Sequence, residues 1–239
     1  MIAADIMTPK VIAIRPDATV ADAVALMLDR RISGLFVVDE QGELAGVLTE
    51  GDLLRRDELG TERHRSWWQT LFASPGRLAA EFTRAHGRRV QDVMTKDVIS
   101  VRPDAPLSDL VGLMETYRVK RVPVIDAERV VGVVSRSDLL RAIAMAARGA
   151  GETTADDRAL REAILQAMAS QPWAPVTTLN VTVAGGVADV WGSISSQEER
   201  RALCVIAENT PGVKHVIDHL VFVETYTGTV IEPAPVKGL

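Results

Sequence analysis

The chain has 239 residues, of which 47% are hydrophobic and only 4% aromatic, so aliphatic side chains must build its core. Its net charge of −5 and single cysteine argue against a strongly basic nucleic-acid-binding protein and against a disulfide-stapled fold. Residues 1–151 balance 21 basic against 21 acidic side chains, whereas residues 152–239 hold 6 against 11. Because neither an export signal nor a membrane-spanning run is found, we expect a cytoplasmic protein without a nucleic-acid partner.

The first half of the chain contains an internal repeat. Asp-Ile-Met-Thr at residues 5–8 returns as Asp-Val-Met-Thr at 92–95, and Arg-Pro-Asp-Ala at 15–18 returns at 102–105. In each copy the spacing of apolar residues predicts the order strand, helix, strand, strand, helix. The sequence therefore predicts an α/β (α+β) protein that contains two βαββα repeats.

Each repeat ends in a glycine, two aliphatic residues, a hydroxyl residue, two variable positions and an aspartate. The two copies are residues 46–52 (the first motif) and 132–138 (the second motif). An apolar run that passes through polar residues into Leu-Leu-Arg indicates a strand feeding a helix. There a carboxylate can accept hydrogen bonds from ribose, while a hydroxyl and free N–H groups can bind phosphate. The same residue types are good helix caps, so capping alone would explain a single copy.

The repeated Met-Thr, Pro-Asp and Gly-x-x-Thr/Ser-x-x-Asp patterns resemble a pair of CBS domains, the Bateman module that senses nucleotides. The resemblance implies that the repeats pack by their sheets about a pseudo-two-fold axis and leave two clefts. It also implies AMP, ADP, ATP or S-adenosylmethionine as possible ligands, and a homodimer formed through the CBS pair.

The same resemblance assigns residues to each cleft. The first cleft would combine the first motif with strands of the second repeat, through Thr49, Asp52, Val98, Ile99, Val119, Lys120 and Arg121. The second would combine Val11, Ile12, Ile32, Ser33, Gly34, Ser135, Arg136 and Asp138. Because Lys120 and Arg121 could pair with phosphate, we expect the phosphorylated ligand in the first cleft. Glu50 argues against this unless it points to solvent, and the two cations could equally be a solvated helix end and strand edge.

An insert separates the repeats, which we place at residues 1–57 and 90–148. Residues 56–89 carry seven arginines against four acidic side chains, together with Trp67 and Trp68. Aromatic and leucine pairs four residues apart predict two short helices broken near Pro75, within an insert at 58–89. Such a basic and aromatic segment suits either an anionic membrane surface or packing against its own domain or a partner subunit.

A linker at residues 149–154 precedes a small domain at 155–225, for which the pattern predicts the order αββαβ. Trp-Gly-Ser-Ile-Ser at 191–195 and Pro-Gly-Val-Lys-His-Val at 211–216 resemble a BON domain. That family is linked to attachment at phospholipid surfaces. Because the acidic excess lies here, a protein partner is at least as good an expectation as phospholipid. We expect residues 226–239 to form a flexible tail.

No arrangement of histidine, serine, cysteine or carboxylates predicts catalysis, so we expect no enzyme, no metal site and no catalytic cofactor. Cys204 lies in an apolar run and is expected in the core. The predicted function is a regulatory, adenine-nucleotide-sensing Bateman module coupled to a BON-like interaction domain. The alternative is a scaffold that docks to membrane phospholipid or a protein partner without a nucleotide, which leaves attachment at the membrane surface open.

Overall fold

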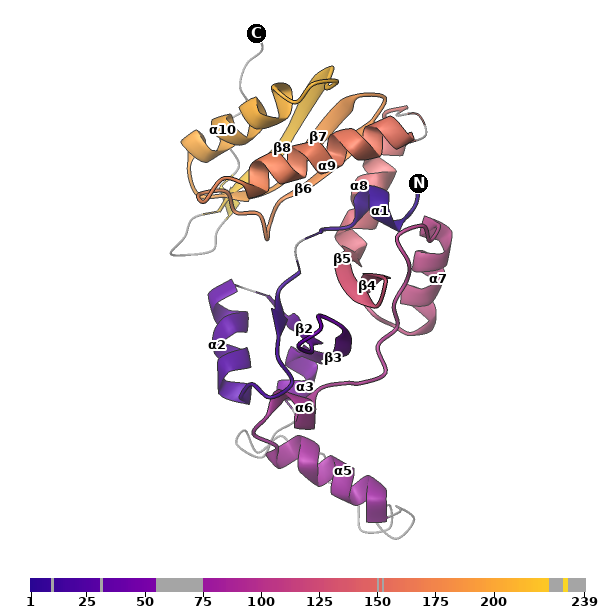
Figure 1. The fold of residues 1–239 in the computed structure, drawn as a ribbon, viewed down its shortest axis with the longest axis vertical. Coiled ribbons are helices and arrows are strands. Elements are labelled where there is room, and N and C mark those ends of the chain that lie inside the picture. Colours follow the sequence, from indigo (N-terminus) through magenta and orange to yellow (C-terminus); the bar gives the residue numbers. More distant parts are fainter. Residues whose placement is uncertain are drawn as a thin grey trace. The chain divides into compact units, whose positions relative to one another are not determined.

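The computed structural model describes residues 1–9, 11–30, 32–54, 75–149, 151, 153–223 and 230–231. The chain divides into two compact units, whose elements are labelled in Figure 1. Unit 1 comprises Met1–Lys10, Ser100–Ile125 and Val131–Leu239; unit 2 comprises Val11–Ile99 and Asp126–Val130. The tryptophan pair of the insert lies outside the described residues.

Unit 2 is built on the first repeat. The strands β1 (Ala13–Ile14), β2 (Gly34–Val38) and β3 (Leu44–Thr49) form one sheet, with β1 parallel and β3 antiparallel to β2. Helix α2 (Val20–Arg30) begins where Thr19 Oγ1 accepts a hydrogen bond from the Asp22 N–H at 3.1 Å, as its capping-box pattern predicts. The core of the unit consists of buried aliphatic side chains from α2 and the sheet: Ala23, Met27, Leu35, Val37 and Leu48. The short helix α3 (Glu50–Leu53) follows β3 directly.

The second repeat follows the same order. Helix α7 (Leu107–Thr116) begins after Pro106, and β4 (Arg121–Asp126) and β5 (Arg129–Ser135) form a two-stranded sheet that runs into α8 (Arg136–Ala147). The first strand of this repeat is reduced to a single parallel bridge between Val101 and Val124. The predicted mixed fold with paired βαββα repeats is therefore confirmed, with one strand shortened.

The leader segment of each repeat packs in the unit built on the other repeat. Helix α1 (Ala3–Ile6) and the residues after it lie in unit 1, where Thr8 and Val133 exchange backbone hydrogen bonds of 2.8 and 3.0 Å. Helix α6 (Val90–Val93) and its continuation lie in unit 2, where Thr95 and Val47 exchange two hydrogen bonds of 2.9 Å. The repeated Met-Thr segment therefore adds a backbone contact to the final strand of the opposite repeat.

This exchange explains why both motifs open with glycine. A Cβ on Gly46 would lie 2.7 Å from Met94 Sδ and 2.8 Å from the Thr95 carbonyl oxygen. A Cβ on Gly132 would lie 2.6 Å from Met7 Sδ. Since real Cβ atoms do not approach so closely, only glycine lets the leader cross the strand.

The C-terminal domain, in unit 1, follows the predicted order. It contains α9 (Ala155–Ala169), β6 (Asn180–Ala184), β7 (Val187–Ile194), α10 (Gln197–Glu208) and β8 (His215–Val223), with β9 (Val230–Ile231) added at the edge. The sheet order is β6-β7-β8-β9, with β7 and β8 parallel. Figure 1 shows α9 and α10 side by side on one face of the sheet. Their buried side chains meet those of the strands in a separate core: Ile164, Met168, Val181, Val190, Leu203 and Leu220.

Helix α5 (Pro75–His86) is the described part of the insert. It begins at the proline where a helix break is predicted, and Phe82 stacks on His86 with ring centroids 4.1 Å apart. Phe82 is 64% exposed, so this helix leaves an aromatic side chain in solvent.

We predict that Gly46→Ala destabilises the protein by about 1–3 kcal/mol, because the new methyl group forces apart β3 and the Met94-Thr95 segment. Gly112 is the matched control, since it lies in α7 with no atom within 4 Å of its Cβ position. Gly112→Ala should be neutral or stabilising by about 0.5–1 kcal/mol. Urea denaturation of both variants tests this, and equal midpoints would contradict the packing role of Gly46.

The carboxylate of Asp157 joins α9 to the turn between β6 and β7, so its contribution to the stability of the C-terminal domain can be tested. Its carboxylate accepts hydrogen bonds from the N–H groups of Thr154 at 3.0 Å and Gly186 at 2.9 Å. Burial opposes ionisation of Asp157, but these N–H donors outweigh it and lower its pKa below the ordinary 3.8. The ionised carboxylate therefore stabilises the fold above the unfolded-state pKa, and this contribution is lost as the pH falls through the lower folded-state pKa.

Asp157→Asn should accordingly cost about 2 kcal/mol at pH 7, because an amide accepts these hydrogen bonds less strongly than a carboxylate. The difference from the parent chain should shrink as the pH falls below 4. Denaturation at pH 7 and pH 3 measures it, and a penalty that grows toward low pH would refute the assignment.

Candidate functional site

The first motif presents a carboxylate that is only partly engaged. Asp52 Oδ2 accepts hydrogen bonds from the Thr49 N–H at 2.9 Å and the Thr49 hydroxyl at 2.7 Å. Among the described residues, Oδ1 has a single contact, a long one of 3.4 Å from Thr95 Oγ1. Asp52 is partly exposed, and Glu50 is exposed to solvent.

The other predicted site residues divide between the two units. Unit 2 holds the first motif together with Val98 and Ile99, and also Val11, Ile12, Ile32, Ser33 and Gly34. Unit 1 holds the second motif together with Val119, Lys120 and Arg121. Each predicted cleft thus draws residues from both units, and the clefts stay predictions.

Within each unit, the residue before the central strand contacts the start of the motif helix. The Glu50 N–H donates to the Ser33 carbonyl at 3.1 Å, and the Arg136 N–H donates to the Lys120 carbonyl at 3.2 Å. The backbone of Lys120 therefore lies beside the second motif, whereas the prediction paired its side chain with the first.

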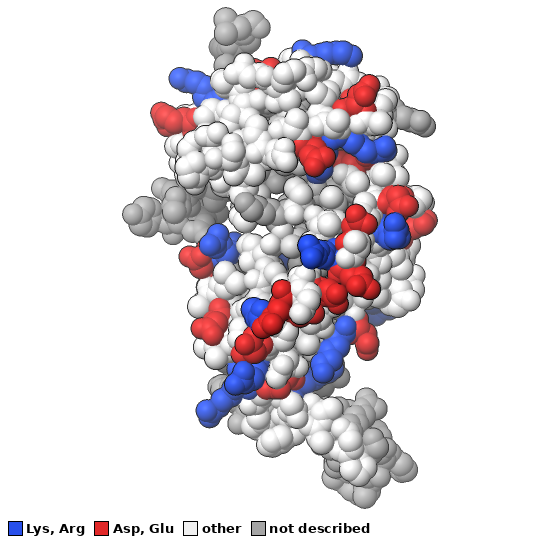
Figure 2. Space-filling view, in the orientation of Figure 1, with Lys and Arg blue, Asp and Glu red and all other residues white. Residues whose placement is uncertain are grey.

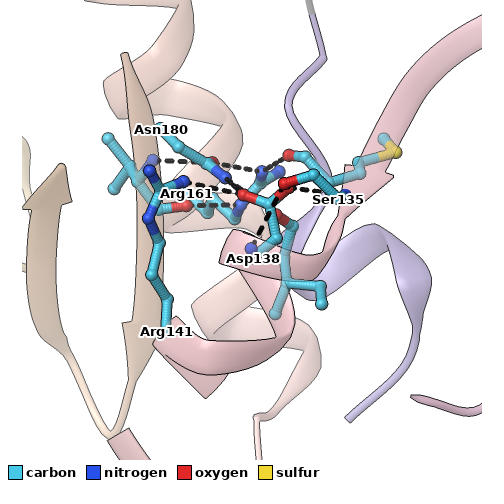
Figure 3. A network of polar contacts seen from close by, with 8 residues as sticks. Ser135, Asp138, Arg141, Arg161 and Asn180 are labelled. Atoms are coloured by element: carbon cyan, nitrogen blue, oxygen red, sulfur yellow. Dashed lines mark hydrogen bonds and ion pairs between the residues drawn. The ribbon is translucent and has the colours of Figure 1, made fainter. Parts of the chain in front are cut away.

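The second motif has a fully engaged carboxylate. Asp138 Oδ2 accepts from the Ser135 N–H at 2.8 Å and the Ser135 hydroxyl at 2.6 Å, the same pair as in the first motif. Its Oδ1 accepts from Arg141 Nη1 at 2.7 Å and from Asn180 Nδ2 at 3.0 Å. Figure 3 shows these side chains gathered around Asp138, which is only 2% exposed. The two motifs, alike in sequence, therefore differ in access.

Asn180 comes from β6 of the C-terminal domain and lies in a buried polar network. Its Nδ2 also donates to the Ile6 carbonyl at 2.8 Å, and its Oδ1 accepts from Arg161 Nη2 at 3.2 Å. Arg161, on α9, further donates to the carbonyls of Val181 and Met7. Burial lowers the pKa of Arg161 to about 10, although Asp5 and Asp138 nearby raise it, so the guanidinium stays protonated at neutral pH.

Helix α8 extends this contact across the sheet. The guanidinium of Arg141 lies 5.6 Å from the centre of the Trp191 ring, which stacks on His219 with ring centroids 3.6 Å apart. Arg148, at the end of α8, pairs with Asp189, which also contacts His219 at 2.6 Å. A cation over an aromatic face and an ion pair to the buried carboxylate of Asp189 both fix orientation.

These contacts lie on the sheet face opposite α9 and α10, which we call the docking face: Asn180, Thr182, Asp189, Trp191 and His219. Sequence reasoning missed it as a contact surface. Alternating polar residues on a strand ordinarily indicate a solvent-facing side. All five residues of β6 are nevertheless buried, so both faces of that strand are covered.

A cavity of about 560 Å³ lies between α9 and the first leader in unit 1. Its walls come from the first leader, β5 and α9 with the loop that follows, and most of the lining is apolar: Met7, Pro9, Val131, Leu165, Met168 and Val176. Arg158 and Arg161 are also part of the wall. The first leader and the C-terminal domain are therefore not closely packed along their whole contact.

The described residues were also compared with the requirements of a metal site, a reactive thiol and a membrane-spanning helix. The described residues hold no group of three or more His, Cys, Asp or Glu side chains arranged for a metal ion. Burial, with the carboxylates of Asp218 and Glu208, raises the pKa of Cys204 to about 11, so its thiol is protonated at neutral pH. None of the helices in the described ranges has the length and hydropathy that crossing a bilayer requires. On the face shown in Figure 2, acidic and basic side chains of the described residues are interspersed.

Comparison with known proteins matches both parts of the chain. The CBS domain model matches residues 3–58 and 90–145, and the BON domain model matches residues 156–224. The CBS domain-containing protein CBSX2 of Arabidopsis thaliana is 29% identical over 150 residues, which cover 58% of this chain and 61% of that protein. The uncharacterized protein MJ1426 of Methanocaldococcus jannaschii is 30% identical over 158 residues, covering 60% of this chain and 91% of that protein.

A solved structure gives the same result for the fold. The crystal structure of CBSX2 in complex with AMP superposes with a TM-score of 0.54 and 29% identity, covering 62% of this chain and 99% of that one. The matched region spans about three fifths of the full plant sequence. The chain therefore belongs to the CBS-domain family and carries two CBS repeats followed by a BON domain.

Proposed function

We propose that the chain is a regulatory module that binds an adenine nucleotide at its first motif and performs no catalysis. The observation that carries the proposal is the difference between the two aspartates. Asp52 is partly exposed, and among the described residues its Oδ1 has only the long Thr95 contact, whereas Asp138 is buried with both oxygens engaged. A carboxylate that binds ribose hydroxyls must have an oxygen available to accept from them.

The chemistry of the first motif suits a nucleoside phosphate. Asp52 Oδ1 would accept from the ribose hydroxyls, and Val98 and Ile99 would border the base with backbone and apolar surface. Thr49, with Lys120 and Arg121, would bind the phosphate. The CBSX2 complex with AMP, at 29% identity, supports AMP as the first ligand to test. ADP, ATP and S-adenosylmethionine are the other ligands to compare.

Regulation requires that the ligand bind two states of the protein with different affinity. We propose that the CBS pair forms a homodimer in the cytoplasm and that the BON domain passes the change to a protein partner or phospholipid. The alternative is a scaffold that uses the same domains for docking without any nucleotide. Absence of binding to every adenosyl ligand would favour the scaffold.

Asp52→Asn should weaken AMP binding by at least about tenfold, because an amide cannot accept from two ribose hydroxyls as a carboxylate does. Glu50→Gln removes the same charge from the exposed neighbour and should leave affinity within about twofold. Isothermal titration calorimetry of the parent chain and both variants measures this. Equal losses in the two variants would point to a general charge effect and contradict the ribose contact.

A further inference from the structure

The second motif already has an occupant, which comes from the same chain. We propose that Asn180 of the BON domain takes the position on Asp138 that a ribose hydroxyl would take, so that BON docking and nucleotide binding at the second motif exclude one another. This inference rests on the proposed function for the class of ligand. It adds that the BON domain regulates the second motif by occupying it.

The hydrogen bonds of Asp138 show that the oxygen a ribose would need is already occupied. In both motifs the Oδ2 atom binds the N–H and hydroxyl at the start of the helix, which leaves Oδ1 for a ligand. At Asp138 that oxygen accepts from Asn180 and Arg141, and each carboxylate oxygen has about two lone pairs to offer. With 2% of the residue exposed, a ribose could reach Oδ1 only after the Asn180 amide had left.

The contact between the C-terminal domain and the second repeat is composed in a way that allows Asn180 to leave Asp138. The C-terminal domain and the second repeat have separate apolar cores, and the cavity of about 560 Å³ lies between α9 and the leader segment. Among the described residues, Thr182 Oγ1 and Trp191 Nε1 on the docking face are buried without a hydrogen-bond partner. Undocking would let water reach both groups, which favours the released state and offsets part of the lost contact.

Several of the contacts that hold the docked state are polar. Arg158 Nε donates to Asp5 Oδ1 at 2.6 Å, and Arg161 donates to the Met7 carbonyl. At the other end, Arg148 pairs with Asp189. Polar contacts of this kind exchange for water more readily than apolar packing does. A ligand that binds only the open motif can therefore shift the balance toward release.

Asn180→Asp is the most informative variant. The new carboxylate still accepts from Arg161 Nη2 and the Val181 N–H, so the BON domain keeps its internal contacts. It can no longer donate to Asp138 and places a second negative charge beside that carboxylate, which disfavours docking. Asn209→Asp is the matched control, since it makes the same change at the exposed end of α10.

Two measurements on the full chain give independent readouts. Calorimetric titration with AMP counts the binding sites in the parent chain, in Asn209→Asp, in Asn180→Asp and in Asn180→Asp combined with Asp52→Asn. Trypsin cleavage after Arg148 reports docking without any ligand, because Asp189 holds the Arg148 side chain in the docked state.

In the parent chain and in Asn209→Asp we expect about one AMP per chain and slow cleavage, since only the first motif is open. Asn180→Asp should bind about two and be cleaved at least about tenfold faster. Asn180→Asp combined with Asp52→Asn should still bind about one AMP, at the second motif.

Two sites in the parent chain would overturn the inference, because the docked motif would then be open. Faster cleavage of Asn180→Asp without an added site would also overturn it, since docking would then not be what closes the motif. Failure of the proposed function has a different outcome. If the parent chain binds no AMP while Asn180→Asp binds one, the first motif is not a nucleotide site and the competition at Asp138 stands.

Discussion

The carboxylate of Asp138 is the point on which unit 1 depends. One of its oxygens caps α8, and the other receives the side chains of Arg141 and Asn180. Asn180 in turn donates to the leader at the Ile6 carbonyl. Helix start, leader segment and BON domain therefore meet at one buried charge. Such a charge is tolerated only when its hydrogen bonds are complete, which makes the three elements mutually dependent.

The same residue pattern has two outcomes in one chain. In both motifs a hydroxyl residue and an aspartate close the helix start in the same way. The neighbours differ in the part of the chain that the structure describes: Thr95 reaches Asp52 with a long contact, whereas Asn180 reaches Asp138 with a good hydrogen bond. A residue from another domain can thus give two motifs of the same sequence pattern different access.

Sequence reasoning was strongest where the pattern is local. The repeat and the αββαβ order of the last domain both follow from residue patterns along the chain, and the structure confirms them. The docking face could not be predicted in this way. A polar residue such as Asn180 on a strand signals solvent, and its partner lies 42 residues away in another domain.

The crossing of the leaders has a consequence for how such a chain could arise. Each final strand binds the Met-Thr segment of the other copy, and the glycine of each motif exists to admit it. A single repeat on its own would leave that strand uncovered and its own leader without a strand. It would have to exchange leaders with a second molecule. Duplication and fusion would convert that intermolecular exchange into an intramolecular one, after which the two copies were free to acquire different partners.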